Sequence, residues 1–132
     1  MSRENVELVR RSYLAFQSGD IDAALAFFDP EGEFVSRFGA MEGRTYRGYD
    51  GIRQYLADIE DAWESYEREL EELIDAGDAV LAILNVEAVS RETGVRLQER
   101  ISLGYWLRED RIVRMVSFPS VEAGRHALGL SG

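Results

Sequence analysis

Residues 94–118 constrain the fold of this chain most strongly, because two alternating apolar segments flank a short polar turn. The turn reads Arg108-Glu109-Asp110-Arg111, and the pattern around it predicts an antiparallel β-hairpin. Strand side chains alternate between two faces, so the first arm carries one carboxylate, Glu99, in an otherwise apolar row. The other members of that row are Val95, Leu97, Ile101, Leu103, Tyr105 and Leu107.

The composition excludes several classes of function. The chain has 132 residues, a formal net charge of −10, no cysteine and no lysine. The negative charge argues against sequence-independent binding of nucleic acid and against anionic membranes. Disulfides, thiolate metal sites and Schiff-base chemistry are excluded, and the single histidine, His126, cannot build a multi-histidine metal site. We expect no cofactor and no metal, and we expect His126 to be exposed.

The chain also lacks the marks of a membrane or exported protein. No apolar run approaches the ~20 residues that a membrane helix needs. The N-terminal segment is charged and amphipathic, unlike a signal peptide. We therefore expect a cytoplasmic protein in which residues 1–132 form a single domain.

The first half of the chain predicts mainly helices. Apolar residues at helical spacing predict helices at residues 3–17 and 20–29, with Asp20 as the cap of the second helix and Pro30 as its end. A short strand at residues 32–39 precedes a glycine-rich loop. A third helix, capped by Asp50, follows that loop.

Residues 61–75 are compatible with two structures. Helical spacing would extend the third helix through them, and periodicity alone favours that interpretation. As a strand, the segment has a poorer alternation, with Tyr66, Arg68 and Leu70 on one face. The acidic run at residues 67–72 is most simply a solvated strand face.

The strand at residues 79–90 is apolar on one face and mixed on the other. Two buried sides are typical of a strand between a core and a subunit interface. If Arg91 lies opposite Val95, Glu87 pairs with Glu99 on one face, and a slip of one residue would undo this. With the hairpin and a terminal helix capped by Ser120, the order of elements indicates an α+β domain.

Four blocks of this sequence are similar to SnoaL-like domains of the nuclear-transport-factor-2-like superfamily. They are ENVELVRRSYLAFQSGDIDAALAFFDPEGEFVS, YRGYDGIRQYLADIEDAW, LIDAGDAVLAI and REDRIVRMVSF, in the order of the family. The resemblance implies a conical α+β fold in which a curved antiparallel sheet wraps N-terminal helices around an apolar pocket, with a short C-terminal helix. It also implies a strand beginning near Ser65, which decides between the two structures for residues 61–75.

The resemblance implies a small pocket protein that binds an apolar or aromatic molecule, commonly as a homodimer. Relatives include polyketide cyclases, ketosteroid isomerases and non-catalytic binding proteins, so the fold does not determine the function. Proton transfer, cyclisation, isomerisation and hydration are the catalytic alternatives. A non-catalytic ligand-binding or dimerisation domain is the other candidate. The isomerases hold an oxyanion with a protonated aspartic acid, and Leu103 occupies that position here.

Glu99 and Tyr105 are the catalytic candidates. A carboxylate enclosed by apolar side chains has a raised pKa and can act as a general base, while a tyrosine on the same face donates to the developing charge. The structural alternative pairs Glu99 with an arginine, such as Arg68 or Arg114, or places it at the solvent-exposed end of the sheet.

The predicted ligand pocket draws on both halves of the chain. The hairpin register leaves open whether Arg114 or Met115 faces it, and analogy favours Met115. The outer face of the sheet, with Trp106 and Val86, is the predicted dimer surface. The pocket candidates are Tyr13, Phe16, Phe34, Tyr55, Trp63, Asn85, Glu87, Leu103 and Met115.

Overall fold

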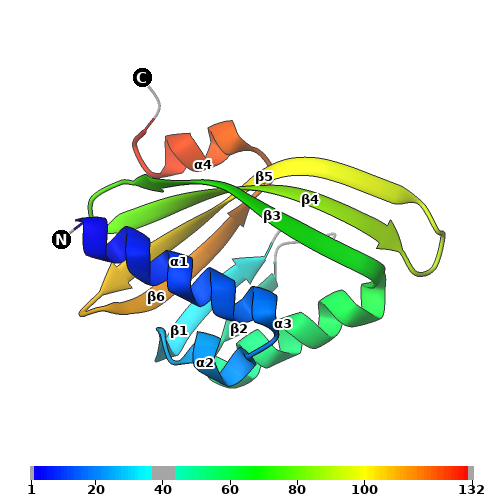
Figure 1. Ribbon diagram of the computed structural model, residues 1–132, viewed down its shortest axis with the longest axis horizontal. Helices are drawn as coiled ribbons and strands as arrows, with labels where there is room; N and C mark the ends of the chain where they lie inside the picture. The colour runs from blue at the N-terminus through cyan, green and yellow to red at the C-terminus, as the bar shows by residue number, and fades with distance from the viewer. Residues whose placement is uncertain (1, 37–43, 131–132) are drawn as a thin grey trace.

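The computed structural model describes residues 2–36 and 44–130. Four helices and a six-stranded sheet make up this part of the chain (Figure 1). In chain order they are α1 (Ser2–Ser18), α2 (Ile21–Leu25), β1 (Phe28–Ser36), β2 (Arg44–Arg47), α3 (Gly48–Ala62), β3 (Trp63–Asp75), β4 (Ala79–Ser90), β5 (Arg96–Arg108), β6 (Arg111–Phe118) and α4 (Val121–Ala127).

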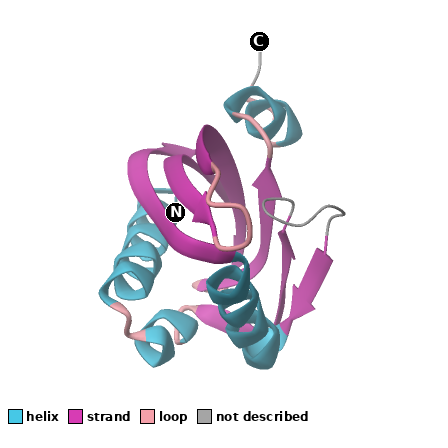
Figure 2. Ribbon diagram, turned by 90° about the vertical axis from the view of Figure 1, so that its right-hand side faces the viewer, coloured by secondary structure: helices cyan, strands magenta, loops and turns pink. Residues whose placement is uncertain are grey.

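The strands lie in the order β2-β1-β6-β5-β4-β3, so β3 to β6 form an antiparallel meander. The sheet is strongly curved, with α1, α2 and α3 on its concave side and α4 on the other side (Figure 2). This arrangement confirms the predicted α+β fold. One part of that prediction is wrong: β1 pairs with β6 in parallel, so the sheet is not antiparallel throughout.

The concave face of the sheet carries the hydrophobic core. On β4 the buried side chains of this face alternate along the strand, as the pleat requires, and α1 packs Val9 and Tyr13 against them. Nearly every inner-face position of the central strands is apolar, because this face is covered by helices. The inner-face residues of β4 are Val80, Ala82, Leu84, Val86 and Ala88, and the buried ones of β5 are Ile101, Leu103, Tyr105 and Leu107.

The hairpin of β5 and β6 is confirmed, and its register answers the open question about its second arm. Glu109 and Asp110 both have positive φ, 52° and 63°, as a two-residue turn that matches the strand twist requires. Tyr105 lies opposite Met115, and Trp106 lies opposite Arg114. Met115 therefore faces the core, and Arg114 lies on the outer face.

Strand β3 is confirmed by the structure, and a bulge explains why its sequence resembles a helix. The pairing with β4 shifts between Leu70 and Glu72, where one extra residue enters β3. Leu70 and Leu73 consequently both pack against the inner core, although they are three residues apart. A spacing of three residues between apolar positions is typical of a helix, so the sequence pattern of this strand resembles a helical one.

Several boundaries in the first half differ from the prediction. Helix α2 ends at Leu25, and Pro30 lies inside β1 instead of ending the helix. Phe28 already pairs with Ile112 of β6, and the β1–β6 register is irregular just after it, so Pro30 falls where its missing N–H costs no regular pairing.

The segment around β2 also differs. The glycine-rich loop was expected to lead straight into the third helix, but it contains β2, and residues 37–43 lie outside the described part of the chain. Asp50 does not cap α3: the residue at the cap position is Arg47, and Asp50 lies in the first turn of the helix. Strand β2 was missed because it pairs only with β1, a contact that local sequence does not reveal.

Helix α4 closes the outer face of the sheet. Ser120 caps it as predicted, accepting a hydrogen bond from the Ala123 amide at 3.1 Å. Gly124 is buried against Leu81 and Ser102, and a Cβ at this position would contact both side chains. His126, in the same helix, is exposed as expected.

We expect Gly124→Ala to lower the free energy of unfolding by about 1 to 3 kcal/mol, because the added methyl group overpacks the contact with Ser102. In an exposed helix the same change raises the free energy of unfolding by about 0.5 to 1 kcal/mol. The sign of the measured change therefore shows whether Gly124 is packed against the sheet. Urea unfolding measures the difference, with His126→Ala as the control on the exposed side of α4. An unchanged or raised stability of Gly124→Ala would contradict this docking.

Candidate functional site

A small internal cavity lies where α1, α3, β1, β3 and β6 meet on the concave face. Its volume is about 20 Å³, enough for roughly one water molecule. Four of the predicted pocket residues, Phe16, Phe34, Tyr55 and Met115, line this cavity, and their role in binding stays a prediction. The predicted deep pocket, however, is almost filled by side chains. The lining residues are Phe16, Phe34, Ile52, Tyr55, Leu56, Arg68 and Met115.

Aromatic rings form the wall of the cavity on the side of β1 and β2. The Phe34 and Tyr55 rings meet edge to face with their centroids 4.5 Å apart, and the Tyr46 ring lies 5.5 Å from that of Tyr55. Such contacts restrict the orientation of each ring. This wall is therefore a rigid, apolar surface.

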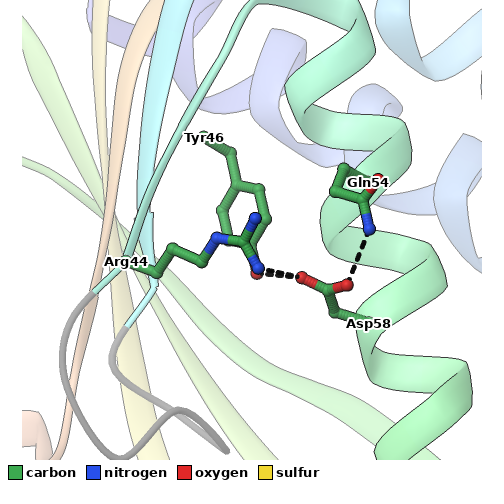
Figure 3. A network of polar contacts seen from close by, with 4 residues as sticks. All are labelled: Arg44, Tyr46, Gln54 and Asp58. Atoms are coloured by element: carbon green, nitrogen blue, oxygen red, sulfur yellow. Dashed lines mark hydrogen bonds and ion pairs between the residues drawn. The ribbon is translucent and has the colours of Figure 1, made fainter.

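A polar network holds this wall in place (Figure 3). Asp58 of α3 accepts hydrogen bonds from the Tyr46 hydroxyl at 2.6 Å, from Arg44 at 2.8 Å and from Gln54 at 2.8 Å. Burial and the bond to Asp58 raise the pKa of Tyr46 to about 12. The same hydrogen bond, followed by that of Gln54, lowers the pKa of Asp58. The network joins β2 to α3 and serves the structure of the site.

Arg68 is the unusual residue of the site. It lies on the inner face of β3, where its Cα pairs with that of Val86. The residue as a whole keeps some solvent exposure, but its guanidinium is desolvated among tyrosines and lies 5.9 Å from the centre of the Tyr66 ring. Burial lowers the pKa of Arg68, the surrounding tyrosine oxygens raise it, and the net direction is upward. The guanidinium therefore remains a cation.

Four tyrosines surround this cation. Burial is the largest cause that raises the pKa of Tyr13, Tyr55, Tyr66 and Tyr105, so their hydroxyls stay protonated and neutral at physiological pH. The Tyr13 hydroxyl donates to the backbone carbonyl of Arg68 at 3.0 Å, and Tyr55 and Tyr66 are hydrogen bonded to each other. The tyrosines provide polar contacts without neutralising the charge.

No carboxylate among the described residues pairs with Arg68. The neighbouring arginines of the sheet differ: Arg100 pairs with Glu71 at 2.6 Å, and Arg114 pairs with Glu33 at 3.0 Å. Those pairs lie on the surface, where water also solvates the charges. At neutral pH the tyrosines are uncharged, so the attraction that raises the pKa of Arg68 is absent and the cost of burying a cation without an ion pair remains.

An open groove reaches Arg68 from outside. It runs along the edge strand β3, with Tyr13, Leu14 and Gln17 of α1 on one side. Beyond the edge of β3 the groove continues over the outer face of the sheet, where Asn85 and Glu87 line it. Arg68 lines both the groove and the internal cavity, so it lies between the solvent and the aromatic wall.

Glu99 lies at the solvent-exposed end of the sheet, as one of the two structural alternatives expected, and not in an enclosed position. It shares the inner-face row of β5, but it is exposed, because the end of the β4–β5 hairpin projects beyond α1 (Figure 1). The expected ion pair with Arg68 or Arg114 is also wrong, since Arg114 pairs with Glu33 and Arg68 has no such partner among the described residues. A catalytic role of Glu99 stays a prediction.

The register of β4 and β5 overturns two further expectations, the pairing of Arg91 with Val95 and that of Glu87 with Glu99. Ser90 donates to the carbonyl of Val95 at 2.9 Å, so the turn is one residue longer than assumed. Glu87 consequently lies opposite Gln98 and not opposite Glu99. Asn85 and Glu87 are on the outer face, outside the internal cavity.

The same register affects the predicted dimer surface. Val86 is completely buried on the inner face, so it cannot contribute to an outer interface. Trp106 does lie on the outer face, half-buried beneath the guanidinium of Arg114 at 5.4 Å from the ring centre. The homodimer itself stays a prediction.

The remaining candidates lie around the cavity without lining it. Tyr105 is buried beside Arg68, and Leu103 belongs to the inner core. Trp63 begins β3 and packs its ring 6.0 Å from that of Tyr66. Sequence reasoning missed Arg68 and Tyr66 as site residues, because the surrounding acidic run suggested a solvated strand. The row Tyr66-Arg68-Leu70 was the signal that could have identified them.

Among the described residues, no cluster of three or more histidine, cysteine or carboxylate side chains has the geometry to hold a metal ion. Within residues 2–36 and 44–130, no helix is long and apolar enough to cross a bilayer.

Comparison with known proteins places the chain among domains of this fold. A family model described as SnoaL-like domain matches residues 9–115. A solved NTF2-like protein from Burkholderia thailandensis E264 is 27% identical, with a TM-score of 0.80 over 86% of this chain and 88% of that chain. No curated protein matches the chain.

Two other similar structures contain small molecules. TerC co-crystallised with polyporic acid is 24% identical, with a TM-score of 0.77 over 96% of this chain and 98% of that one. RV0760c from Mycobacterium tuberculosis, in complex with estradiol-17beta-hemisuccinate, is 14% identical, with a TM-score of 0.70 over 90% and 95% of the two chains. At these identities, the likeness concerns the fold alone.

We expect Arg68→Met to raise the free energy of unfolding by about 1 to 3 kcal/mol, because an apolar side chain of similar length replaces an unpaired, desolvated charge. Urea unfolding at neutral pH measures the effect. The matched control is Arg100→Met, which removes an exposed ion pair and should lower the stability by about 0 to 1 kcal/mol. A less stable Arg68→Met protein would show that the guanidinium has stabilising contacts after all.

Proposed function

Because the chain belongs to the SnoaL-like domain family, we propose that it binds an apolar or aromatic small molecule on the concave side of its sheet. The observation that carries the proposal is the aromatic cavity that meets an open groove at Arg68. Ligand sites are usually apolar concavities with a few convergent polar groups, and here Arg68 and the tyrosine hydroxyls are those groups. The ligand complexes of TerC and RV0760c support the proposal by analogy.

The ligand enters by displacing side chains. The cavity of about 20 Å³ is far smaller than the roughly 150 Å³ of an apolar cavity that binds benzene. Phe16 of α1 and Leu56 of α3 are only half-buried, so they are the parts of the lining that can move outward. Met115 is unbranched and adapts its shape to its neighbours. In this proposal Phe16 and Leu56 move outward, while Phe34 and Tyr55 stay in place.

We expect Phe16→Ala to bind 2-naphthol at least threefold more tightly than the unmodified protein, because the smaller side chain opens the cavity before the ligand arrives and removes part of the cost of rearrangement. Isothermal titration calorimetry measures the affinity. Arg11→Ala, on the exposed side of α1, is the control and should bind as the unmodified protein does. Absence of binding to all three proteins, with thermal melts showing them folded, would overturn the proposed function.

Catalysis is the extension of this proposal. The cation of Arg68 and the hydroxyl of Tyr105 can stabilise negative charge on an enolising carbonyl group, and Glu99 would be the base. Val86 lies between Arg68 and Glu99 in the strand register, so their Cα atoms are roughly 10 Å apart, two strand spacings. A ligand of two rings spans that distance.

Binding without turnover is the second candidate, and the exposure of Glu99 favours it. An exposed carboxylate is solvated and lacks the desolvation that makes a strong general base near neutral pH. The two candidates therefore differ in whether Glu99 performs chemistry on a bound molecule.

Deuterium exchange at C1 of 2-tetralone in D₂O, followed by NMR, distinguishes them. If Glu99 is the base, the unmodified protein accelerates exchange and Glu99→Gln loses roughly 100-fold of that rate, the usual contribution of a general base. Glu87→Gln, on the outer face, should retain the full rate. Equal rates for Glu99→Gln and the unmodified protein would assign the protein to binding without this chemistry.

A further inference from the structure

We propose that the ligand is an aromatic carboxylate and that the guanidinium of Arg68 binds its carboxylate group. This inference rests on the proposed function and specifies the chemical class of the ligand. It starts from the surroundings of Arg68 on the concave face, where the cation lies among tyrosines and apolar side chains and no carboxylate among the described residues pairs with it. A ligand that brings an anion would pair with this cation.

The acidic residues of the neighbouring elements do not supply this anion. Glu67 and Glu69 flank Arg68 along β3, but the strand alternation sends both to the outer, exposed face. Glu99 shares the inner face with Arg68 and its charge acts on Tyr66, but Val86 of β4 lies between the two strand positions and no ion pair joins them among the described residues. On α3, the carboxylate of Asp58 is already bound to Arg44, Tyr46 and Gln54 (Figure 3).

The geometry of the site favours a carboxylate over other anions. The guanidinium is a planar fork of N–H donors that matches a carboxylate with two parallel hydrogen bonds. The groups next to it are aromatic, and Phe34 and Tyr55 offer ring surfaces against which a planar hydrophobic body can pack. A dianion such as phosphate would lose more hydration energy here, and the net charge of −10 repels it further.

The groove has carboxylates on the side of the outer sheet face, where Glu67, Glu69 and Glu87 line it, and Arg10 on the side of α1, so an acid approaches along α1. Arg68 lies where the open groove meets the cavity, so an acid arriving from the groove reaches the guanidinium first. Its ring then continues toward the wall of Phe34 and Tyr55. Gln17 and Tyr13 border the same entrance, and both donate to the backbone carbonyl of Arg68, which fixes this part of β3.

The test compares 2-naphthoate with 2-naphthamide, which has the same ring system and a neutral head group. We expect the unmodified protein to bind 2-naphthoate at least tenfold more tightly, since hydrogen bonds to charged groups contribute more than neutral ones. Arg68→Met should reduce this ratio to about one while its affinity for 2-naphthamide changes less than about threefold, since an apolar side chain of similar length preserves the ring site. Calorimetry at constant ionic strength measures both ligands.

Arg100→Met is the matched control, because it removes a surface arginine outside the cavity and should retain the preference for the acid. Equal affinities of the unmodified protein for the two ligands would overturn the inference and leave the proposed function intact. A preference that persists in Arg68→Met would also overturn it, since another group would then bind the acid. Failure of both ligands to bind the folded protein would refute the proposed function, and the inference with it.

Discussion

The burial of the inner face of β4 and β5 is the constraint on which the rest of this structure depends. Each apolar side chain there contributes roughly 1.5 to 3 kcal/mol by leaving water, and the two strands present an almost unbroken row of them. Helix α1 covers this row, and the curvature of the sheet brings α3 and β1 to the same interior. Every group that enters this space must be apolar, hydrogen bonded or functional.

Arg68 departs from that constraint. A cation on an apolar inner face opposes folding, and the tyrosines around it offer hydroxyl groups and ring faces without an opposite charge. Strained or costly features of this kind concentrate at binding sites, where a ligand supplies what the protein lacks. The internal cavity is small because core side chains pack densely.

The two faces of the sheet have different roles. The outer face is closed by α4 at one end, where Gly124 allows the helix to approach Leu81 and Ser102. Beyond α4, that face carries surface ion pairs such as Arg100 with Glu71, which add little stability individually. The inner face holds the aromatic wall, and the network around Asp58 anchors that wall to α3. Structural support and the candidate site therefore use different residues.

The sequence by itself determined the β5–β6 hairpin, the caps at Asp20 and Ser120 and the order of most elements, because turns, caps and alternation are local. Resemblance to a family, rather than periodicity, identified β3 as a strand. Only the tertiary structure decided the β4–β5 register, which places Glu87 on the outer face, the exposure of Glu99 at the end of that hairpin, and the surroundings of Arg68. The physical reason is that one residue in a turn or bulge exchanges the two faces of a strand, and long-range packing selects between them.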